Sequence, residues 1–237
     1  MSQDMYYALY ALLYFLCIVA ALISIFASIR VKSVYKRFRK QRAASGLTGA
    51  EVAQRILESE GIYDVTFKRV RGELTDYYDP RNRQIALSND IGDGNSVAAV
   101  CIAAHECGHA IQHFVGYGPH SFRSALAPVS SIGSKLAWPI IFVGFLFNNS
   151  MGTMLLDVGV VMFALAVFFE LVTLPVEFDA SRRAIKKLDE LGILAMEEQR
   201  GAKKVLNAAA MTYVAAAASA IIQLLRLLLI VNGRRRD

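Results

Sequence analysis

The 237-residue sequence predicts an α-helical multi-pass membrane protein with a small α+β domain on the cytoplasmic side. Hydrophobic residues make up 55% of the chain and the mean hydropathy is +0.38, whereas a soluble domain is usually about 45–50% apolar. The apolar residues gather in long blocks, and a polar, mixed segment separates the first block from the next. Clusters of Lys and Arg flank these blocks, as they do at the cytoplasmic ends of membrane helices.

The first block predicts a membrane anchor over residues 1–30. Met5 to Ile29 carries no charge and is long enough to span a bilayer. The four residues before it lack the basic start of a secretory signal, so we expect the segment to be retained. Seven Lys and Arg residues between Arg30 and Arg42 follow it. The positive-inside rule places them in the cytoplasm and the N-terminus outside.

Residues 31–130 are expected to form the cytoplasmic domain. Thr48 and Glu51 form a capping box, which predicts a short amphipathic helix ending at Gly61. A further helix is expected from Ser96 to about Phe114, in an Ala/Val/Ile-rich run. Alternating or β-branched patterns predict strands at 65–70, 74–78 and 84–88, a turn at 79–82 and a loop at 90–95.

The second predicted helix carries the pattern HExxH, at His105, Glu106 and His109. Residues four apart on a helix face the same way, so the two imidazoles can share a Zn²⁺. Glu106 beside them can accept a proton from water. Two satisfied core histidines would leave Glu106 unexplained, because an unpaired charge on a buried helix costs several kcal/mol. The pattern therefore predicts a zincin-like metalloprotease domain.

Beyond a loop expected at 116–128, residues 131–176 predict a transmembrane hairpin. Apolar stretches at 132–147 and 153–176 flank a turn at 148–152 that has no Lys or Arg, as an outer loop should. Residues 177–204 are rich in Lys and Arg and are expected inside. Residues 205–237 form a last hydrophobic helix that either spans the membrane or lies partly in the interface, because three terminal Arg outside would break the charge rule.

Zinc needs a third protein ligand, and the sequence offers several candidates. His113 is eight residues, about 12 Å, along the helix from His105 and cannot converge on the same ion. Glu177 begins the segment that returns from the hairpin, so it can approach the motif without a long loop. We expect Glu177 to be the ligand. The alternatives are Glu170, Asp179 and His120.

Four segments carry a family resemblance: Leu74–Arg81, Ala103–His113, Thr173–Ala184 and Val205–Ala215. Together they resemble the YugP-type membrane zinc metallopeptidases of prokaryotes, and the likeness covers nearly the whole chain. More distantly, the order of zinc helix, hairpin and Glu-Phe-x-Ala is similar to the HtpX and CAAX-protease group of gluzincins. The resemblance implies that Glu177 is the third ligand. The wider group has Asp four residues later, where this chain has Ser181, so Asp179 or another carboxylate is expected to fix a zinc histidine.

These observations predict a membrane-embedded zinc endopeptidase that acts on peptides or membrane proteins. Its active site would face the cytoplasm, and regulatory membrane proteins are further candidate partners. A substrate could add as a strand beside the sheet at Ile85, Ala86 and Leu87, unless these residues are simply core. A donor for the tetrahedral intermediate is also needed. The candidates are Tyr117, His120, Arg182 and Tyr213.

Other classes of function are less consistent with the sequence. A catalytically silent zinc scaffold, its metal shell closed by His120 or Asp179, would have no use for Glu106. A transporter is disfavoured because the spans hold few charges and no repeat. The net charge of +6 is largely accounted for by the basic collars, so nucleic-acid binding is not expected. The cysteines lack a CxxC pair, which indicates a reducing side without a disulfide framework; they are Cys17, Cys101 and Cys107.

Overall fold

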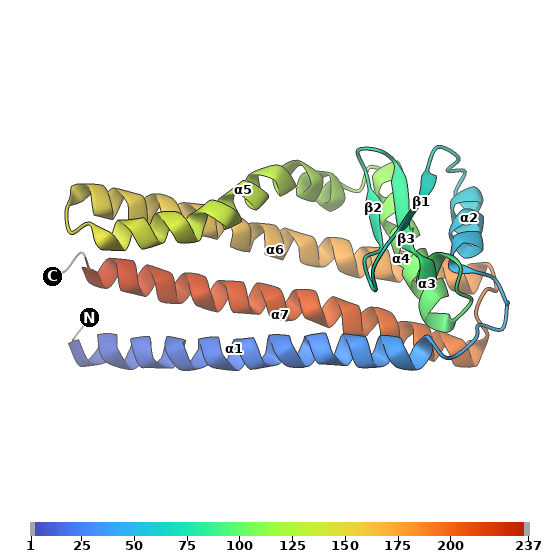
Figure 1. Cartoon of the computed structure of the whole chain (residues 1–237), viewed down its shortest axis with the longest axis horizontal. Coiled ribbons are helices and arrows are strands. Elements are labelled where there is room, and N and C mark those ends of the chain that lie inside the picture. Colours follow the sequence, from blue (N-terminus) through green and yellow to red (C-terminus); the bar gives the residue numbers. More distant parts are fainter. Residues whose placement is uncertain (1–2, 235–237) are drawn as a thin grey trace. The chain divides into compact units, whose positions relative to one another are not determined.

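The computed structural model describes residues 3–234 and is mostly helical (Figure 1). Four of its helices are long and apolar enough to cross a membrane: α1, α5, α6 and α7. The chain divides into two compact units, one of residues 1–27, 123–173 and 213–237, the other of residues 28–122 and 174–212. In chain order the elements are α1 (Gln3–Phe38), α2 (Gly49–Ser59), β1 (Thr66–Val70), β2 (Tyr77–Asp79), β3 (Gln84–Ser88), α3 (Asn89–Gly92), α4 (Val97–Phe114), α5 (Gly118–Leu146), α6 (Ser150–Glu190) and α7 (Met196–Arg234).

The first unit, here called the membrane unit, consists of the most apolar parts of these four helices. Its outer surface exposes many large apolar side chains, such as Phe26 at 65% and Phe142 at 66%, as expected of surfaces that face lipid. Glycines let α5 and α6 approach closely, since a Cβ on Gly159 would lie 2.4 Å from the Ile141 side chain. Behind them a small core is formed by Ala137, Ile141, Leu156, Phe163, Val167, Leu227 and Val231.

Polar contacts also hold the helices of the membrane unit together. The hydroxyls of Ser24 and Ser219 lie 3.0 Å apart and join α1 to α7. The guanidinium of Arg226 on α7 stacks over the ring of Tyr14 on α1, 5.3 Å from its centroid. Arg234 donates to the carbonyl of Gly144 at the end of α5. Such contacts are typical of membrane helices, where water does not compete for polar groups.

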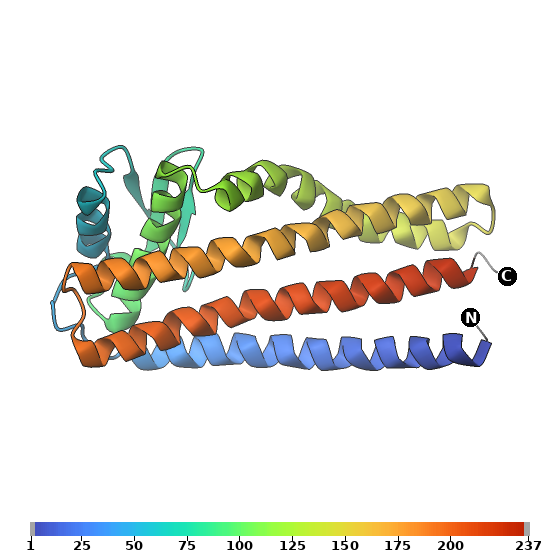
Figure 2. The same cartoon turned by 180° about the vertical axis from the view of Figure 1, so that it is seen from behind.

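The second unit carries the HExxH motif, from which the sequence predicts hydrolysis, and is for that reason called the catalytic unit. It contains the three-stranded sheet in the order β1-β3-β2. β1 runs parallel to β3 and β2 runs antiparallel to it, with Tyr78 opposite Ile85. The middle strand β3 is almost wholly buried. Helix α2 begins at a complete capping box, in which Thr48 and Glu51 bond each other's backbone N–H, and Figure 2 shows the sheet, α2 and α4 gathered in one part of the molecule.

Helix α4 lies at the centre of the catalytic unit. Ser96 caps it by accepting from the Ala99 N–H at 3.2 Å, and its first eight residues are buried apart from Ile102, which is partly buried. Gly108 allows the close approach of α6, because a Cβ at that position would lie 2.5 Å from the carbonyl oxygen of Ala180. The absence of a side chain at Gly108 thus allows a small separation between the two helices, and hence between the side chains that they carry.

Most of the expected elements are confirmed, with four corrections. The turn expected at 148–152 is shorter, because α6 already begins at Ser150. β2 begins at Tyr77 and so is shorter than the predicted strand 74–78. The segment expected as a loop at 90–95 includes α3. The loop expected at 116–128 is wrong beyond Gly116, because α5 already begins at Gly118. Pro119 lies in its first turn, where no helical N–H is required, and membrane helices tolerate an internal proline such as Pro128.

Candidate metal centre

Helix α4 presents the motif side chains on one face because His105 and His109 are one turn apart. Their rings meet edge to face with centroids 4.8 Å apart. Both rings are largely buried, with side-chain exposures of 14% and 10%. Glu106, between them in sequence, is 6% exposed. The helix therefore brings two imidazoles and one carboxyl to a nearly water-free place.

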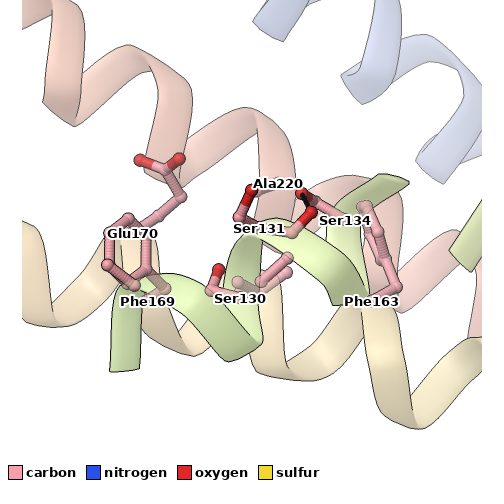
Figure 3. Close-up of a pocket in the computed structure, with 10 residues that line it drawn as sticks. Ser130, Ser131, Ser134, Phe163, Phe169, Glu170 and Ala220 are labelled. Carbon is pink, nitrogen blue, oxygen red and sulfur yellow. Dashed lines mark hydrogen bonds between the residues drawn. The ribbon is translucent and has the colours of Figure 1, made fainter. Parts of the chain in front are cut away.

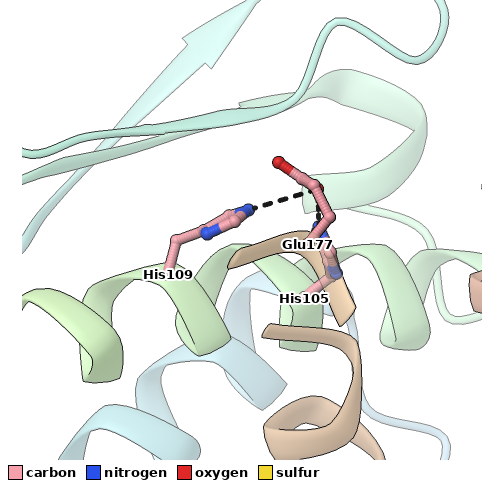
Figure 4. Close-up of side chains that lie close together, drawn as sticks. All are labelled: His105, His109 and Glu177. Atoms are coloured by element: carbon pink, nitrogen blue, oxygen red, sulfur yellow. Dashed lines mark hydrogen bonds and ion pairs between the residues drawn. The ribbon is translucent and has the colours of Figure 1, made fainter. Parts of the chain in front are cut away.

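Helix α6 brings Glu177 to the same place, 72 residues after His105. Its Oε2 lies 3.3 Å from Nε2 of His105 and 3.7 Å from Nε2 of His109. Figure 4 shows the carboxylate reaching toward both imidazoles, as dashed lines from each ring mark. Glu177 is 2% exposed, so water does not compete for these contacts.

These three side chains fit a zinc ion. One donor atom from each residue lies within 4.8 Å of the other two, and the ligand atoms of a tetrahedral zinc lie roughly 3.3–3.6 Å apart. Two imidazole nitrogens and a carboxylate oxygen are also the donors that catalytic zinc sites use, leaving a fourth position open. A small inward movement of the side chains would complete the triangle.

The second nitrogen of each imidazole is held by a neutral side chain. Nδ1 of His105 lies 3.2 Å from the hydroxyl of Ser181. Nδ1 of His109 lies 3.0 Å from Oε1 of Gln112. Because an amide oxygen only accepts, Nδ1 of His109 carries a hydrogen, and Nε2 is the nitrogen that faces Glu177. The ring orientation required for metal binding is thus set by the protein.

Asp179 supports this arrangement through Gln112. The amide nitrogen of Gln112 donates to Oδ2 of Asp179 at 2.9 Å and to the carbonyl of Val176 at 2.8 Å. Arg183 and Arg182 also donate to Asp179. Burial favours the neutral form of Asp179, but these hydrogen bonds outweigh it and hold its pKa below the usual range. An anchored carboxylate therefore fixes Gln112, and Gln112 fixes His109.

The two glutamates of the centre are shifted in opposite directions. Burial is the largest influence on Glu106 and raises its pKa, although His105 and His109 oppose the shift. Burial acts in the same direction on Glu177, but hydrogen bonds and charge from the two histidines outweigh it and lower the pKa. The environments therefore separate a carboxylate suited to a cation from a carboxyl suited to accepting and releasing a proton.

The remaining candidates lie in varied places. His120 is 3% exposed, and its ring centroid is 6.0 Å from that of His109. The ring of Tyr117 lies beneath the guanidinium of Arg183, 5.7 Å from the centroid. The side chain of Arg182 is 76% exposed beside Asp179. Two others belong to the membrane unit: Tyr213 on α7 and Glu170, which lines a groove there.

His113 lies outside the group that could hold a metal, among the residues described. Its Nδ1 is 2.8 Å from the hydroxyl of Tyr78 on β2, and burial raises the pKa of that phenol to about 12. No motif in the sequence distinguishes Tyr78 from the other residues of its strand. Gln112 has a usable signal that was missed, because it is a polar residue one turn after His109 on a buried helix.

Comparison with known proteins bears on the same residues. A family model described as "Putative neutral zinc metallopeptidase" matches residues 13–232. The chain belongs to this family. It is also similar to a protein of Bacillus subtilis (strain 168) named "Putative membrane protease YugP", with 45% identity over 221 residues, 93% of this chain and 97% of that protein. The comparison with solved structures found no match.

Membership of the family confirms the resemblance drawn from the sequence. The protein is a membrane protein of a zinc-peptidase family, and its three-residue cluster could hold the metal that the family name implies. The matched residues extend across all four candidate spans and the HExxH helix. The likeness thus includes the membrane helices as well as the catalytic unit.

Proposed function

We propose that the protein is a zinc-dependent endopeptidase of the membrane that hydrolyses peptide bonds of protein substrates. The observation that supports this is the meeting of His105, His109 and Glu177, with the buried carboxyl of Glu106 on the same helix. A purely structural zinc site needs no such carboxyl, whereas hydrolysis needs a base beside the metal.

In this proposal His105, His109 and Glu177 hold the zinc, and Ser181 and Gln112 keep the imidazoles in place. Bound there, zinc would supply a Lewis acid that makes water more acidic and polarises the scissile carbonyl. Glu106 accepts the proton of the attacking water and then passes it to the leaving amine. Its raised pKa suits both steps, because a stronger base holds the proton until the amine departs.

The substrate would lie along an outer strand of the sheet. Ile85, Ala86 and Leu87 are fully buried on the central strand β3, so their interpretation as core is confirmed and that strand offers no free edge. β2 is an outer strand and contacts α4, the helix that carries the motif. An extended peptide added beside β2 would gain main-chain hydrogen bonds next to the proposed catalytic group.

The test is hydrolysis of an unfolded, fluorescently labelled protein by the purified full-length protein in detergent, with zinc content measured in parallel. Glu106→Gln should keep zinc and lose about 10²–10⁴-fold in rate, the usual contribution of a general base. His105→Ala should lose zinc as well as activity. Glu58→Gln, on the exposed end of α2, is the matched control and should behave as wild type. Cleavage by Glu106→Gln at the wild-type rate would show that the mechanism is wrong.

We further propose that the catalytic unit faces the cytoplasm, because Lys and Arg cluster after the first span and after the hairpin. Single cysteines placed at Asn148 and Asp90 test this with a reagent that does not cross membranes. Cysteine at 148 should be modified in intact cells, and cysteine at 90 only after permeabilisation. Strong labelling at 90 in intact cells would reverse the proposed orientation.

A further inference from the structure

The membrane unit contains a groove of about 470 Å³ that the proposed chemistry does not use. One face of α5 forms a wall of it, with small residues at positions i, i+3, i+4 and i+7 from Ala127. α6 forms the facing wall and α7 contributes Ala220. Figure 3 shows the Ser131 and Ser134 hydroxyls and the Glu170 carboxylate directed to the same side, toward the α7 ribbon. The groove is thus apolar with a few polar groups, as ligand sites generally are.

Two polar side chains in the groove lack a hydrogen bond to any other described residue. Ser130 is 5% exposed, lines the groove and makes none through its hydroxyl. Glu170 is the only charged residue that lines the groove, and Arg123 on α5 attracts it without a described hydrogen bond. A polar group without a protein partner is costly on an apolar membrane helix. These two positions therefore point to a ligand that supplies hydrogen-bond donors.

Two other charged side chains of the membrane unit already have a structural role. Arg226 stacks on Tyr14, and Arg234 donates to carbonyls at the end of α5. Glu170 differs from them because it faces open volume in the groove. It lies six positions before Val176, where the apolar stretch of α6 ends (176 − 170 = 6). A donor carried about two turns inside the end of another membrane helix would meet it at that depth.

We propose that this groove binds a membrane-spanning segment of a protein substrate and that Glu170 recognises a lysine on it. This inference rests on the proposed protease function and names a substrate class for it. The lysine ammonium would donate to the Glu170 carboxylate, and the substrate helix would pack on the small residues of α5. Ser130 offers a further hydroxyl to a polar group of that helix.

The shape of the groove favours a helix over a lipid. Small side chains at Ala127, Ser131 and Ser134 follow one line along α5, with Ala166 opposite them on α6. Such positions let the backbone of a third helix approach closely, which is how membrane helices gain packing energy. A flexible lipid chain gains nothing from that regular spacing. The spacing of these side chains therefore favours a helical partner. Binding of a lipid with an ammonium headgroup is the competing outcome that the test distinguishes.

The experiment measures binding to the full-length Glu106→Gln protein, so that cleavage does not interfere. The probes are two fluorescent helical peptides of about 20 apolar residues, identical except for Lys or Leu one to two turns before one end. The protein is placed in nanodiscs of phosphatidylcholine, and binding is followed by energy transfer. Glu170→Gln is added to test recognition, and Asp157→Asn, an acid of the same helix that does not line the groove, is the matched control.

We expect the Lys peptide to bind about 10–100-fold more tightly than the Leu peptide, the usual effect of a charged hydrogen bond. Glu170→Gln should abolish that preference, and Asp157→Asn should retain it. Ala166→Leu, which fills the groove, should weaken both peptides. Equal binding of the two peptides to the protein with Glu170 intact would overturn the proposal. The proposal would also be overturned if neither peptide binds and native mass spectra show phosphatidylethanolamine retained by the protein with Glu170 but lost from Glu170→Gln.

This binding assay can fail independently of the proposed protease function. If the wild-type protein does not hydrolyse the unfolded reporter but the Lys peptide binds as expected, the groove is a helix-binding site and the enzymatic proposal is wrong. If the reporter is cleaved and the peptides bind equally, the enzyme stands and the groove proposal falls. Thermal melting of each variant shows whether a loss reflects unfolding.

Discussion

Replacing Gln112 by Met tests whether the protein itself sets the zinc site. Met has nearly the same length and is apolar, so the change removes the three hydrogen bonds of Gln112 while filling its space. Gln112 is fully buried, and its partners are Nδ1 of His109, the carbonyl of Val176 and Oδ2 of Asp179. Asp179 keeps two arginine partners, so His109 is the group most affected.

The magnitude follows from these contacts. Loss of the bond to Asp179 and a buried, unsatisfied N–H on His109 should together lower the free energy of unfolding by about 3 kcal/mol or more. An imidazole that is no longer oriented should bind zinc about 10–100-fold more weakly, the usual cost of losing a group that hydrogen-bonds a zinc histidine. Ser181→Ala, which releases His105 instead, should weaken zinc binding in the same way without touching Asp179.

Zinc affinity would be measured in detergent by competition with a coloured chelator, and stability by thermal melting with and without zinc. Gln54→Met is the matched control, because Gln54 lies on the exposed face of α2 and bonds only Glu58 among the residues described. The reasoning would be refuted if Gln112→Met bound zinc within about twofold of wild type while melting at the same temperature. His109 would then be oriented by something other than Gln112.

Two further perturbations test the packing and the electrostatics of the catalytic unit. Gly108→Ala should weaken zinc binding and lower the melting temperature, because a Cβ 2.5 Å from the Ala180 carbonyl must push α6 away. The expected cost of overpacking, about 1–3 kcal/mol, exceeds the roughly 1 kcal/mol that alanine gains over glycine in a helix. Gly118→Ala is the control, because a Cβ there meets no atom within 4 Å. Asp76→Asn addresses pH: burial raises the pKa of Asp76, whose Oδ1 accepts from the Ser88 N–H at 2.7 Å. A raised carboxyl pKa stabilises the fold below the pKa of the unfolded state, and this stability is lost as pH rises through the pKa of the folded state. The melting temperature of Asp76→Asn relative to wild type should therefore rise over that interval and then level off. A difference from wild type that stays constant with pH would contradict this account.

The sequence predicted those parts of the structure that local chemistry decides. The capping box at Thr48 and Glu51 begins α2 as expected, and the first residue of α4 follows its cap, Ser96. β3 matches its predicted range because its apolar residues are buried on the central strand. The failures have a physical cause as well. The loop expected at 116–128 is helical beyond Tyr117, because Pro119 lies in the first turn of α5 and a membrane helix keeps its backbone hydrogen bonds despite a proline such as Pro128.

The metal centre separates local from tertiary information in the same way. The spacing of His105 and His109 is a property of one helix, so the sequence alone could predict that both side chains lie on the same face. The approach of Glu177 could be inferred only from the return of the hairpin and from family resemblance, because it depends on how α4 and α6 pack at Gly108. The structure supplies that packing and brings the three side chains together.

The partners of the imidazoles show where sequence reasoning stops. Asp179 or another carboxylate was expected to fix a zinc histidine, since the wider group has an Asp four residues after its third ligand. In the structure the amide of Gln112 links Asp179 to His109, and the hydroxyl of Ser181 lies 3.2 Å from Nδ1 of His105. Neutral partners raise the basicity of a zinc imidazole less than a carboxylate does, so a zinc ion bound by His105 and His109 would keep more of its positive charge for water and carbonyl. A Ser181→Asp variant should therefore bind zinc more tightly and hydrolyse more slowly, and faster hydrolysis by that variant would show that the neutral pair is not tuned for catalysis.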